Sequence, residues 1–286
     1  MLFLRLTETI MNCKTIGDIA RHELMINIRN KWTLIFAIVF AVLVVGISYF
    51  GIVAEGFSGM ENFTRTSASM LNLVLYLVPL VSLTMGTLSF TGDKAIVELL
   101  FAQPVSRTEV LLGKLAGLFA SLSLSMMLGF LAAGSVILSF NGSDGLLAYA
   151  SFVFLSLVLG LVFLCLSAAV AVANRRTSRA FGVSLFLWFF FVLFYDLIAL
   201  GTTVLLSGQS ANYFLFASLF GNPVDMVRVA TLILLDNVTI FGAAGAALVR
   251  FLGGTTISIL FLFAALFCWA AFPILGARWL LQNQDI

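Results

Sequence analysis

The chain is poor in the side chains from which most enzyme and metal sites are built. Its 286 residues include one histidine and three cysteines, which stand far apart at positions 13, 165 and 268. Isolated cysteines provide neither a C-x-x-C ligand pair nor a disulfide framework. A phosphate-binding G-x-x-x-x-G-K-[ST] loop is also absent, because Gly113-Lys114 lacks the earlier glycine and precedes Leu115. We therefore predict that this chain has no catalytic residues, no metal site and no cofactor of its own.

Charged residues are equally scarce, at 10% of the chain, whereas 62% of the residues are hydrophobic. The mean hydropathy of +1.13 is far above that of a soluble domain. Six apolar runs reach or exceed the roughly 20 residues that cross a bilayer. They are residues 32–53, 69–90, 110–140, 146–173, 180–206 and 255–281. We predict an all-α integral membrane protein with six transmembrane helices in a single domain over residues 1–286.

The distribution of lysine and arginine predicts the orientation of these helices. With the N-terminus inside, 12 of the 15 basic residues lie on the cytoplasmic side, and only Arg65, Arg228 and Arg250 lie outside. Positive residues are enriched in cytoplasmic loops, so both termini are expected in the cytoplasm. The net charge of +2 follows from this anchoring and gives no reason to expect a nucleic-acid partner.

The most informative polar interruption is residues 92–114, which carries six of the 28 charged residues. Pro104 cannot continue a helix, so we expect a short helix over 93–102 and a separate helix after the proline. Ser106 and Glu109 have the spacing of a capping box, in which each side chain accepts from the other residue's backbone amide. The pattern predicts a short surface helix followed by a capped entry into the membrane.

A second polar interruption, residues 207–254, precedes the last span. Part of it is apolar enough for a seventh span, but Asp225, Arg228 and Asp236 make that costly, and a seventh span would put the C-terminus outside. We expect re-entrant or interfacial helices at the outer leaflet instead. Asp225 and Arg228 stand three residues apart, so they can pair across one helical turn.

Three further patterns concern single helices. Residues 14–31 predict a partly amphipathic helix before the first span, with Glu23 and Asn27 interrupting its apolar face. In the third span, small residues recur every fourth position from Gly113 to Ala133, which favours close packing either within the subunit or with a second copy. Asp196 lies deep in the fifth span, where it is either a structural carboxylate bonded to a neighbouring helix or part of a translocation path.

The polar loop carries a family resemblance. Its strings Glu98-Leu99-Leu100, Pro104-Val105-Ser106-Arg107 and Gly113-Lys114 resemble the first cytoplasmic loop of type-2 ATP-binding-cassette (ABC) permeases, although an ordinary solvated loop is the simpler alternative. The resemblance implies a coupling helix within residues 92–109 that contacts a cytoplasmic ATPase dimer, which binds ATP and magnesium. The implied contact residues are Glu98, Leu99, Pro104, Ser106, Arg107 and Glu109, with Arg175, Arg176 and Arg179 in the second cytoplasmic loop. It also implies a homodimer in the bacterial inner membrane and a connecting helix over 14–31.

The outer string Asn222-Pro223-Val224-Asp225-Met226-Val227-Arg228 resembles a narrower branch of that family, which serves copper-site maturation of nitrous oxide reductase. This resemblance implies a periplasmic β-helical partner, with Asn222, Pro223, Asp225 and Arg228 as candidate contacts. Two alternatives remain: an exporter permease for another solute, and a membrane-embedded enzyme or anchor that uses Asp196.

Overall fold

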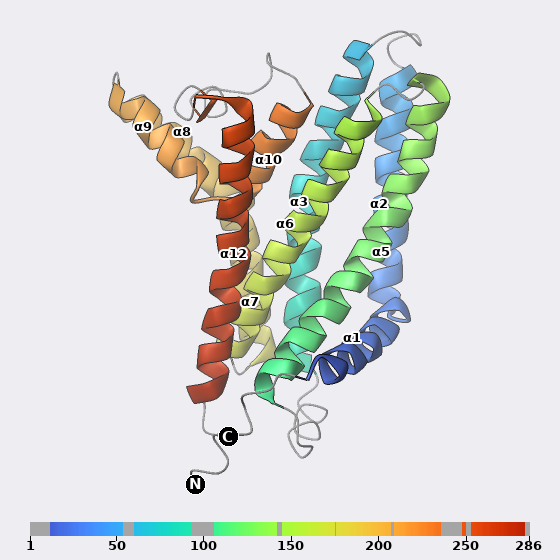
Figure 1. The fold of residues 1–286 in the computed structure, drawn as a ribbon, viewed down its shortest axis with the longest axis vertical. Helices are drawn as coiled ribbons and strands as arrows, with labels where there is room; N and C mark the ends of the chain where they lie inside the picture. The colour runs from blue at the N-terminus through green and yellow to red at the C-terminus, as the bar shows by residue number, and fades with distance from the viewer. Residues whose placement is uncertain are drawn as a thin grey trace.

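The computed structural model describes residues 12–53, 60–92, 106–141, 145–174, 176–206, 209–235, 248–249 and 253–283. Long helices run side by side in a bundle, and one short helix lies across its lower end (Figure 1). The long helices are α2 (Lys31–Val53), α3 (Met60–Gly92), α5 (Arg107–Asn141), α6 (Leu146–Ala173) and α12 (Thr255–Asn283), together with α7 (Thr177–Phe189) and its continuation α8 (Tyr195–Leu205). The short crosswise helix is α1 (Cys13–Ile28). We call the lower end of the bundle the α1 end.

The six predicted spans are confirmed. Within the described residues, six stretches are long and apolar enough to cross a membrane. They are Lys31–Gly51, Ser69–Gly92, Arg107–Ser139, Leu146–Ala173, Thr177–Leu205 and Thr255–Asn283. The start of α1 and the end of α12 both lie at the α1 end (Figure 1), as an even number of crossings requires.

The N-terminal helix is shorter than predicted, and its buried face includes polar side chains. It ends at Ile28, and a new cap starts α2, because the Asn30 side chain accepts from the Trp32 backbone amide at 3.0 Å. Glu23 and Asn27, which seemed to spoil the apolar face, are buried against the bundle. The helix is therefore held by polar as well as apolar contacts, which the hydrophobic pattern alone did not predict.

Helix α6 lies at the centre of the bundle, where it contacts α3, α5, α12 and a later helix, α10 (Pro223–Leu234). The core beside it includes aromatic rings packed edge to face, with Phe130 5.2 Å from Phe40 and 5.5 Å from Phe152 between ring centroids. Gly129 makes room for this packing, since a Cβ there would lie 2.8 Å from the Phe40 ring. At Gly113, Gly117 and Gly129, the small-residue stripe of α5 packs against α1 and α2 of the same subunit.

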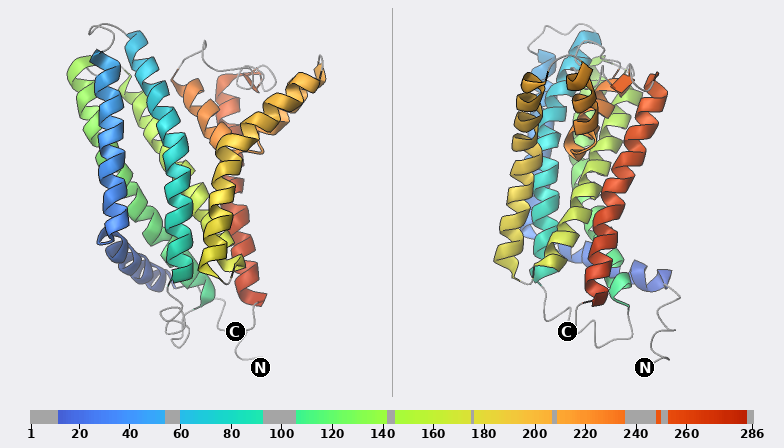
Figure 2. Two further views of the ribbon diagram at one scale, coloured as in Figure 1. Left: turned by 180° about the vertical axis from the view of Figure 1, so that it is seen from behind. Right: turned by 90° about the vertical axis from the view of Figure 1, so that its left-hand side faces the viewer.

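The fifth span consists of two parts joined by a π-helical segment, Phe190–Phe194. Below it, three side-chain hydrogen bonds join α7 to α3: Ser184 to Thr87 at 2.6 Å, Thr177 to the Thr91 carbonyl at 3.3 Å, and Trp188 to the Tyr76 carbonyl at 2.9 Å. Above it, α8 has no buried residue and leans away from the bundle (Figure 2). The π segment is thus where the fifth span leaves α3.

A re-entrant pair of helices fills part of the space that α8 leaves. Helix α9 (Gln209–Leu219) descends into the bundle, and α10 (Pro223–Leu234) returns to the same end after a bend of 103° (Figures 1 and 2). Nine residues of α10 are buried, and the helix contacts α6, α12 and α3. The prediction of re-entrant helices before the last span is confirmed.

Candidate functional site

The capping box at the start of α5 is present as predicted. The Glu109 amide donates to the Ser106 hydroxyl at 3.2 Å, and the Ser106 amide donates to Glu109 Oε2 at 2.9 Å. The other carboxylate oxygen of Glu109 accepts from the Asn12 backbone amide at 2.7 Å. Because Asn12 is also the N-cap of α1, one carboxylate joins the first turns of α1 and α5. The segment that leads out of residues 93–105 is therefore attached directly to the crosswise helix.

A second polar cluster lies one to two turns deeper, where α1, α3 and α5 meet. Glu23 Oε1 accepts from the Ser89 hydroxyl at 2.5 Å and from the Asn27 side-chain amide at 2.9 Å. Lys114 Nζ lies 3.7 Å from Glu23 Oε2 and donates to the Ser89 carbonyl at 2.9 Å. Together these contacts join one residue from each of the three helices, and we call Glu23, Ser89 and Lys114 the polar junction.

The remaining predicted contacts at this end divide into two groups. Glu98, Leu99, Pro104 and Arg175 lie outside the described residues. Arg107 donates to the Leu281 carbonyl at 2.5 Å, so part of its hydrogen-bonding capacity serves the end of α12. Arg176 and Arg179 are exposed at the start of α7. A helix N-terminus is an unfavourable place for a cation, so stability of α7 does not account for these two arginines.

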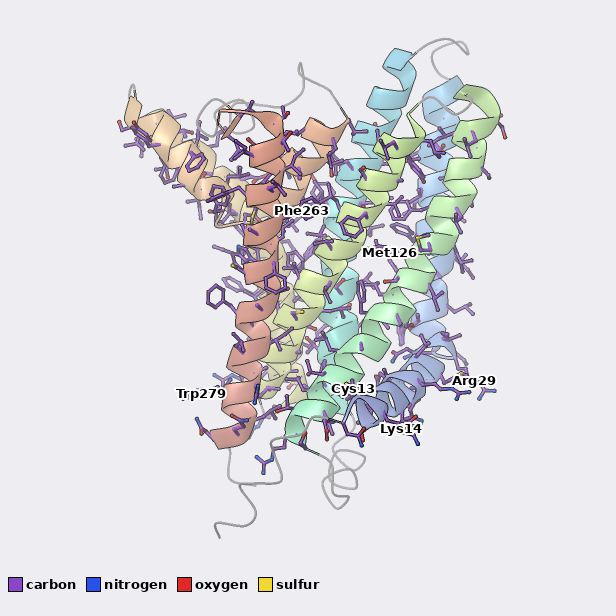
Figure 3. All side chains as sticks on the ribbon, in the orientation of Figure 1. Cys13, Lys14, Arg29, Met126, Phe263 and Trp279 are labelled. Atoms are coloured by element: carbon purple, nitrogen blue, oxygen red, sulfur yellow. The ribbon has the colours of Figure 1, made fainter. Side chains whose placement is uncertain are left out.

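Exposed basic side chains also mark the crosswise helix. Figure 3 shows Lys14 near the start of α1 and Arg29 just beyond its end, both pointing away from the helices above. Trp279 and the end of α12 lie at the same end of the molecule. The polar and basic surface of the described residues therefore gathers at the α1 end.

Three charged residues form a cluster where α8 and α10 approach each other. One guanidinium nitrogen of Arg228, Nη1, lies 2.7 Å from Asp225 Oδ1 and 2.9 Å from Asp196 Oδ2. The predicted Asp225–Arg228 pair across one turn is confirmed. For Asp196, the structure shows the bonded carboxylate of the first interpretation, with its partner on α10. Its side chain remains 40% exposed, whereas that of Asp225 is 15% exposed.

The outer string is less exposed than the sequence suggested. Asn222 is fully buried and caps α10, where its side chain accepts from the Val224 amide at 3.0 Å and donates to the Phe191 carbonyl at 2.9 Å. Pro223 is also buried, at the first position of the helix, where its missing N–H costs nothing. Of the four candidate contacts for a periplasmic partner, these two are therefore buried in this subunit. Asp225 and Arg228 keep partial exposure.

Sequence reasoning missed the polar junction. Its signal was present, since Glu23 and Asn27 are four residues apart on the face of α1 that also holds Ile16, Ile19 and Ala20. Lys114 follows Gly113 in an otherwise apolar helix. The partner residues come from α3 and α5, so only the tertiary structure shows that they meet. Among the residues with described positions, no three histidine, cysteine or acidic side chains come together as a metal site would need.

Comparison with known proteins identifies the class. Residues 18–286 match the family described as ABC-2 family transporter protein, so the chain belongs to that family. It is a permease subunit of an ABC transporter, and membership implies an ATPase partner and a dimeric arrangement.

Two relatives carry the name probable ABC transporter permease protein NosY. The one from Pseudomonas aeruginosa is 34% identical over 277 residues, which cover 95% of this chain and 99% of the relative. The one from Stutzerimonas stutzeri is 34% identical over 239 residues, which cover 82% of this chain and 84% of the relative.

Proposed function

We propose that this permease serves copper-site maturation of nitrous oxide reductase, and that a separate cytoplasmic ATPase drives it through residues 92–109. Support for this branch of the family comes from the outer string 222–228 and from the two NosY permeases, which are similar over most of the chain. In this proposal ATP and magnesium bind to the ATPase dimer, and the permease itself catalyses no reaction.

The main support for the coupling role is that the segment after the loop, at the start of α5, is bonded both within α5 and to α1. Glu109 caps α5 and at the same time accepts from the backbone amide of Asn12, the N-cap residue of α1. A push on residues 92–109 is therefore passed to the crosswise helix and to the long helix α5 together. In this proposal Glu98, Leu99, Pro104, Ser106, Arg107 and Glu109 form the ATPase contact, and Arg175, Arg176 and Arg179 extend it from the second loop.

The proposed orientation places the α1 end in the cytoplasm. Basic residues of the described chain gather there, among them Lys14, Arg21, Arg29 and Arg179, all of which are exposed. Positive residues near span ends are retained on the cytoplasmic side. Both termini are then cytoplasmic, and the re-entrant pair α9–α10 opens toward the periplasm.

On the periplasmic side, we propose that a β-helical accessory protein receives the motion. The partly exposed Asp225 and Arg228 are its candidate contacts. Asn222 and Pro223, being buried, act by holding α10 in place. Two copies of the permease, each with six spans, and two ATPase subunits complete the proposed assembly.

Charge reversal in the loop tests the coupling role. We expect Glu98→Lys to leave the permease in the membrane while lowering the copper content of nitrous oxide reductase at least tenfold in cells. Arg107→Glu should act in the same direction, with an added effect from its lost bond to the Leu281 carbonyl. The matched control is Asp144→Lys, between the third and fourth apolar runs and therefore on the other side of the membrane in the proposed orientation. Full maturation of the enzyme by both loop variants would contradict the coupling role and would show that the loop only connects two spans.

A further inference from the structure

The polar junction connects the two helices that flank residues 93–105. Ser89 lies one turn before the end of α3, and Lys114 lies two turns after the start of α5. Lys114 Nζ donates to the Ser89 carbonyl, and the Ser89 hydroxyl donates to Glu23 on α1. The ion pair between Lys114 and Glu23 closes this triangle. The base of the loop is thus held together by charged and polar groups from three helices.

The burial of these charges is the unusual feature. The side chains of Lys114 and Glu23 are only 5% and 8% exposed. Desolvating two charges is expensive, and an apolar pair of similar volume often gives equal or greater stability. Stability alone therefore does not explain an ion pair at this place. What an apolar pair cannot supply is the directional bonding of Lys114 and Glu23 to Ser89.

Close backbone approach makes this bonding sensitive to small movements. A Cβ on Gly117 would lie 2.5 Å from the Ala20 carbonyl oxygen and 2.6 Å from Glu23 Cβ. Helix α1 therefore rests on the backbone of α5 at the junction. At its other end, α1 is attached through the bond between Asn12 and Glu109. The two attachments bracket α1 against the first turns of α5.

We propose that Lys114 and Glu23 are positioning residues for coupling, which make α1 and the flanks of the loop, α3 and α5, move as one body. The proposal rests on the proposed function of residues 92–109 as the ATPase contact. Motion imposed on the loop reaches α3 through Ser89 and α1 through Glu23, so the crosswise helix follows the loop instead of staying at the membrane surface. The pair acts through its neighbours and touches neither nucleotide nor cargo.

The test compares Lys114→Met with the double variant Glu23→Met/Lys114→Met in the assembled transporter. The single variant leaves the Glu23 carboxylate buried without its cation and should lower the melting temperature. The double variant removes both charges and should recover most of that loss. Copper-site maturation should remain at least tenfold below wild type in both, because both lose the bond from Lys114 to the Ser89 carbonyl. If Lys114 and Glu23 only stabilised the fold, maturation in the double variant would recover together with its melting temperature.

A readout that needs no cargo is hydrogen exchange before and after ATP is added to the complex. In the wild type, exchange should change together in α1 and in the first turns of α5. In the double variant only α5 should respond. A response of α1 equal to that of the wild type, together with normal maturation, would overturn the proposal. Where the methionine variants do not assemble, Glu23→Gln repeats the comparison. It removes the ion pair with Lys114 and keeps an acceptor for the Ser89 hydroxyl, so the α1 response should be reduced but not abolished. A full wild-type response of α1 with normal maturation would again overturn the proposal.

Two controls separate this proposal from the function on which it rests. Lys31→Met makes the same change at an exposed lysine at the start of α2 and should behave as wild type. Deleting the permease and restoring it tests whether maturation depends on this chain at all. Maturation that survives the deletion contradicts the proposed function, whereas dependence on the permease with normal coupling in Glu23→Met/Lys114→Met contradicts only the role of the pair.

Discussion

At the scale of single residues, the cluster where α8 and α10 approach each other shows how one cation serves two carboxylates. Arg228 contacts both Asp196 and Asp225, which come from different helices. Charges at membrane depth need such partners, since an unpaired ion costs several kcal/mol there. The arginine is thus the central member, and either carboxylate alone is less important because the other remains bonded.

We expect Arg228→Met to destabilise the subunit more than Asp196→Asn does. The first change leaves two carboxylates without their cation, one of them largely buried, at a cost of about 1–3 kcal/mol. Asp196→Asn removes one carboxylate charge and keeps an acceptor oxygen, while Arg228 stays paired with Asp225. The two variants are compared by thermal unfolding of the detergent-purified protein. Equal melting temperatures for the two variants would show that the cluster does not share one cation in this way.

At the scale of helices, the sequence predicted some features well because their causes are local. The six spans follow from runs of apolar residues, and the capping box follows from two residues three positions apart. The polar contacts on the buried face of α1 could not be predicted in this way. Its Glu23 looks like a flaw in an amphipathic pattern until Ser89 and Lys114, which are distant in sequence, are brought to it.

The re-entrant pair shows the same limit. Charge counting correctly argued against a seventh span, but it suggested that the string 222–228 faces outward. Asn222 is instead buried, because its side chain satisfies both the start of α10 and a carbonyl in the π segment. That segment was itself not predicted, since no proline or glycine marks Phe190–Phe194.

Alanine substitutions at glycines of α5 and α2 should have opposite effects on stability. A Cβ at Gly117 would press on the Ala20 carbonyl at 2.5 Å, so Gly117→Ala should push α1 away from α5 and lower stability. A Cβ at Gly46 meets nothing within 4 Å, so Gly46→Ala should leave stability unchanged or raise it, by up to about 1 kcal/mol. Thermal unfolding and hydrogen exchange in α1 measure both effects. Unchanged exchange in α1 of Gly117→Ala would contradict the close contact.

At the scale of the whole molecule, several of the polar contacts between helices lie together at the α1 end. The α1 end holds the capping box, the polar junction and the exposed arginines, and each is attached to at least one long helix. At the opposite end, α8 has no buried residue, whereas α10 is packed against α6, α12 and α3. In the proposed function, motion applied at the α1 end is carried by the long helices toward this end.

The central claim is that this chain is a permease moved by a separate ATPase, and its most direct test is the composition of the native complex. The chain would be purified from its own membranes in mild detergent, and the intact particle would be weighed by native mass spectrometry. We expect two copies of the 31.0 kDa chain together with two copies of an ATPase. A particle that contains this chain alone, with ATP hydrolysis absent from the purified material, would contradict it.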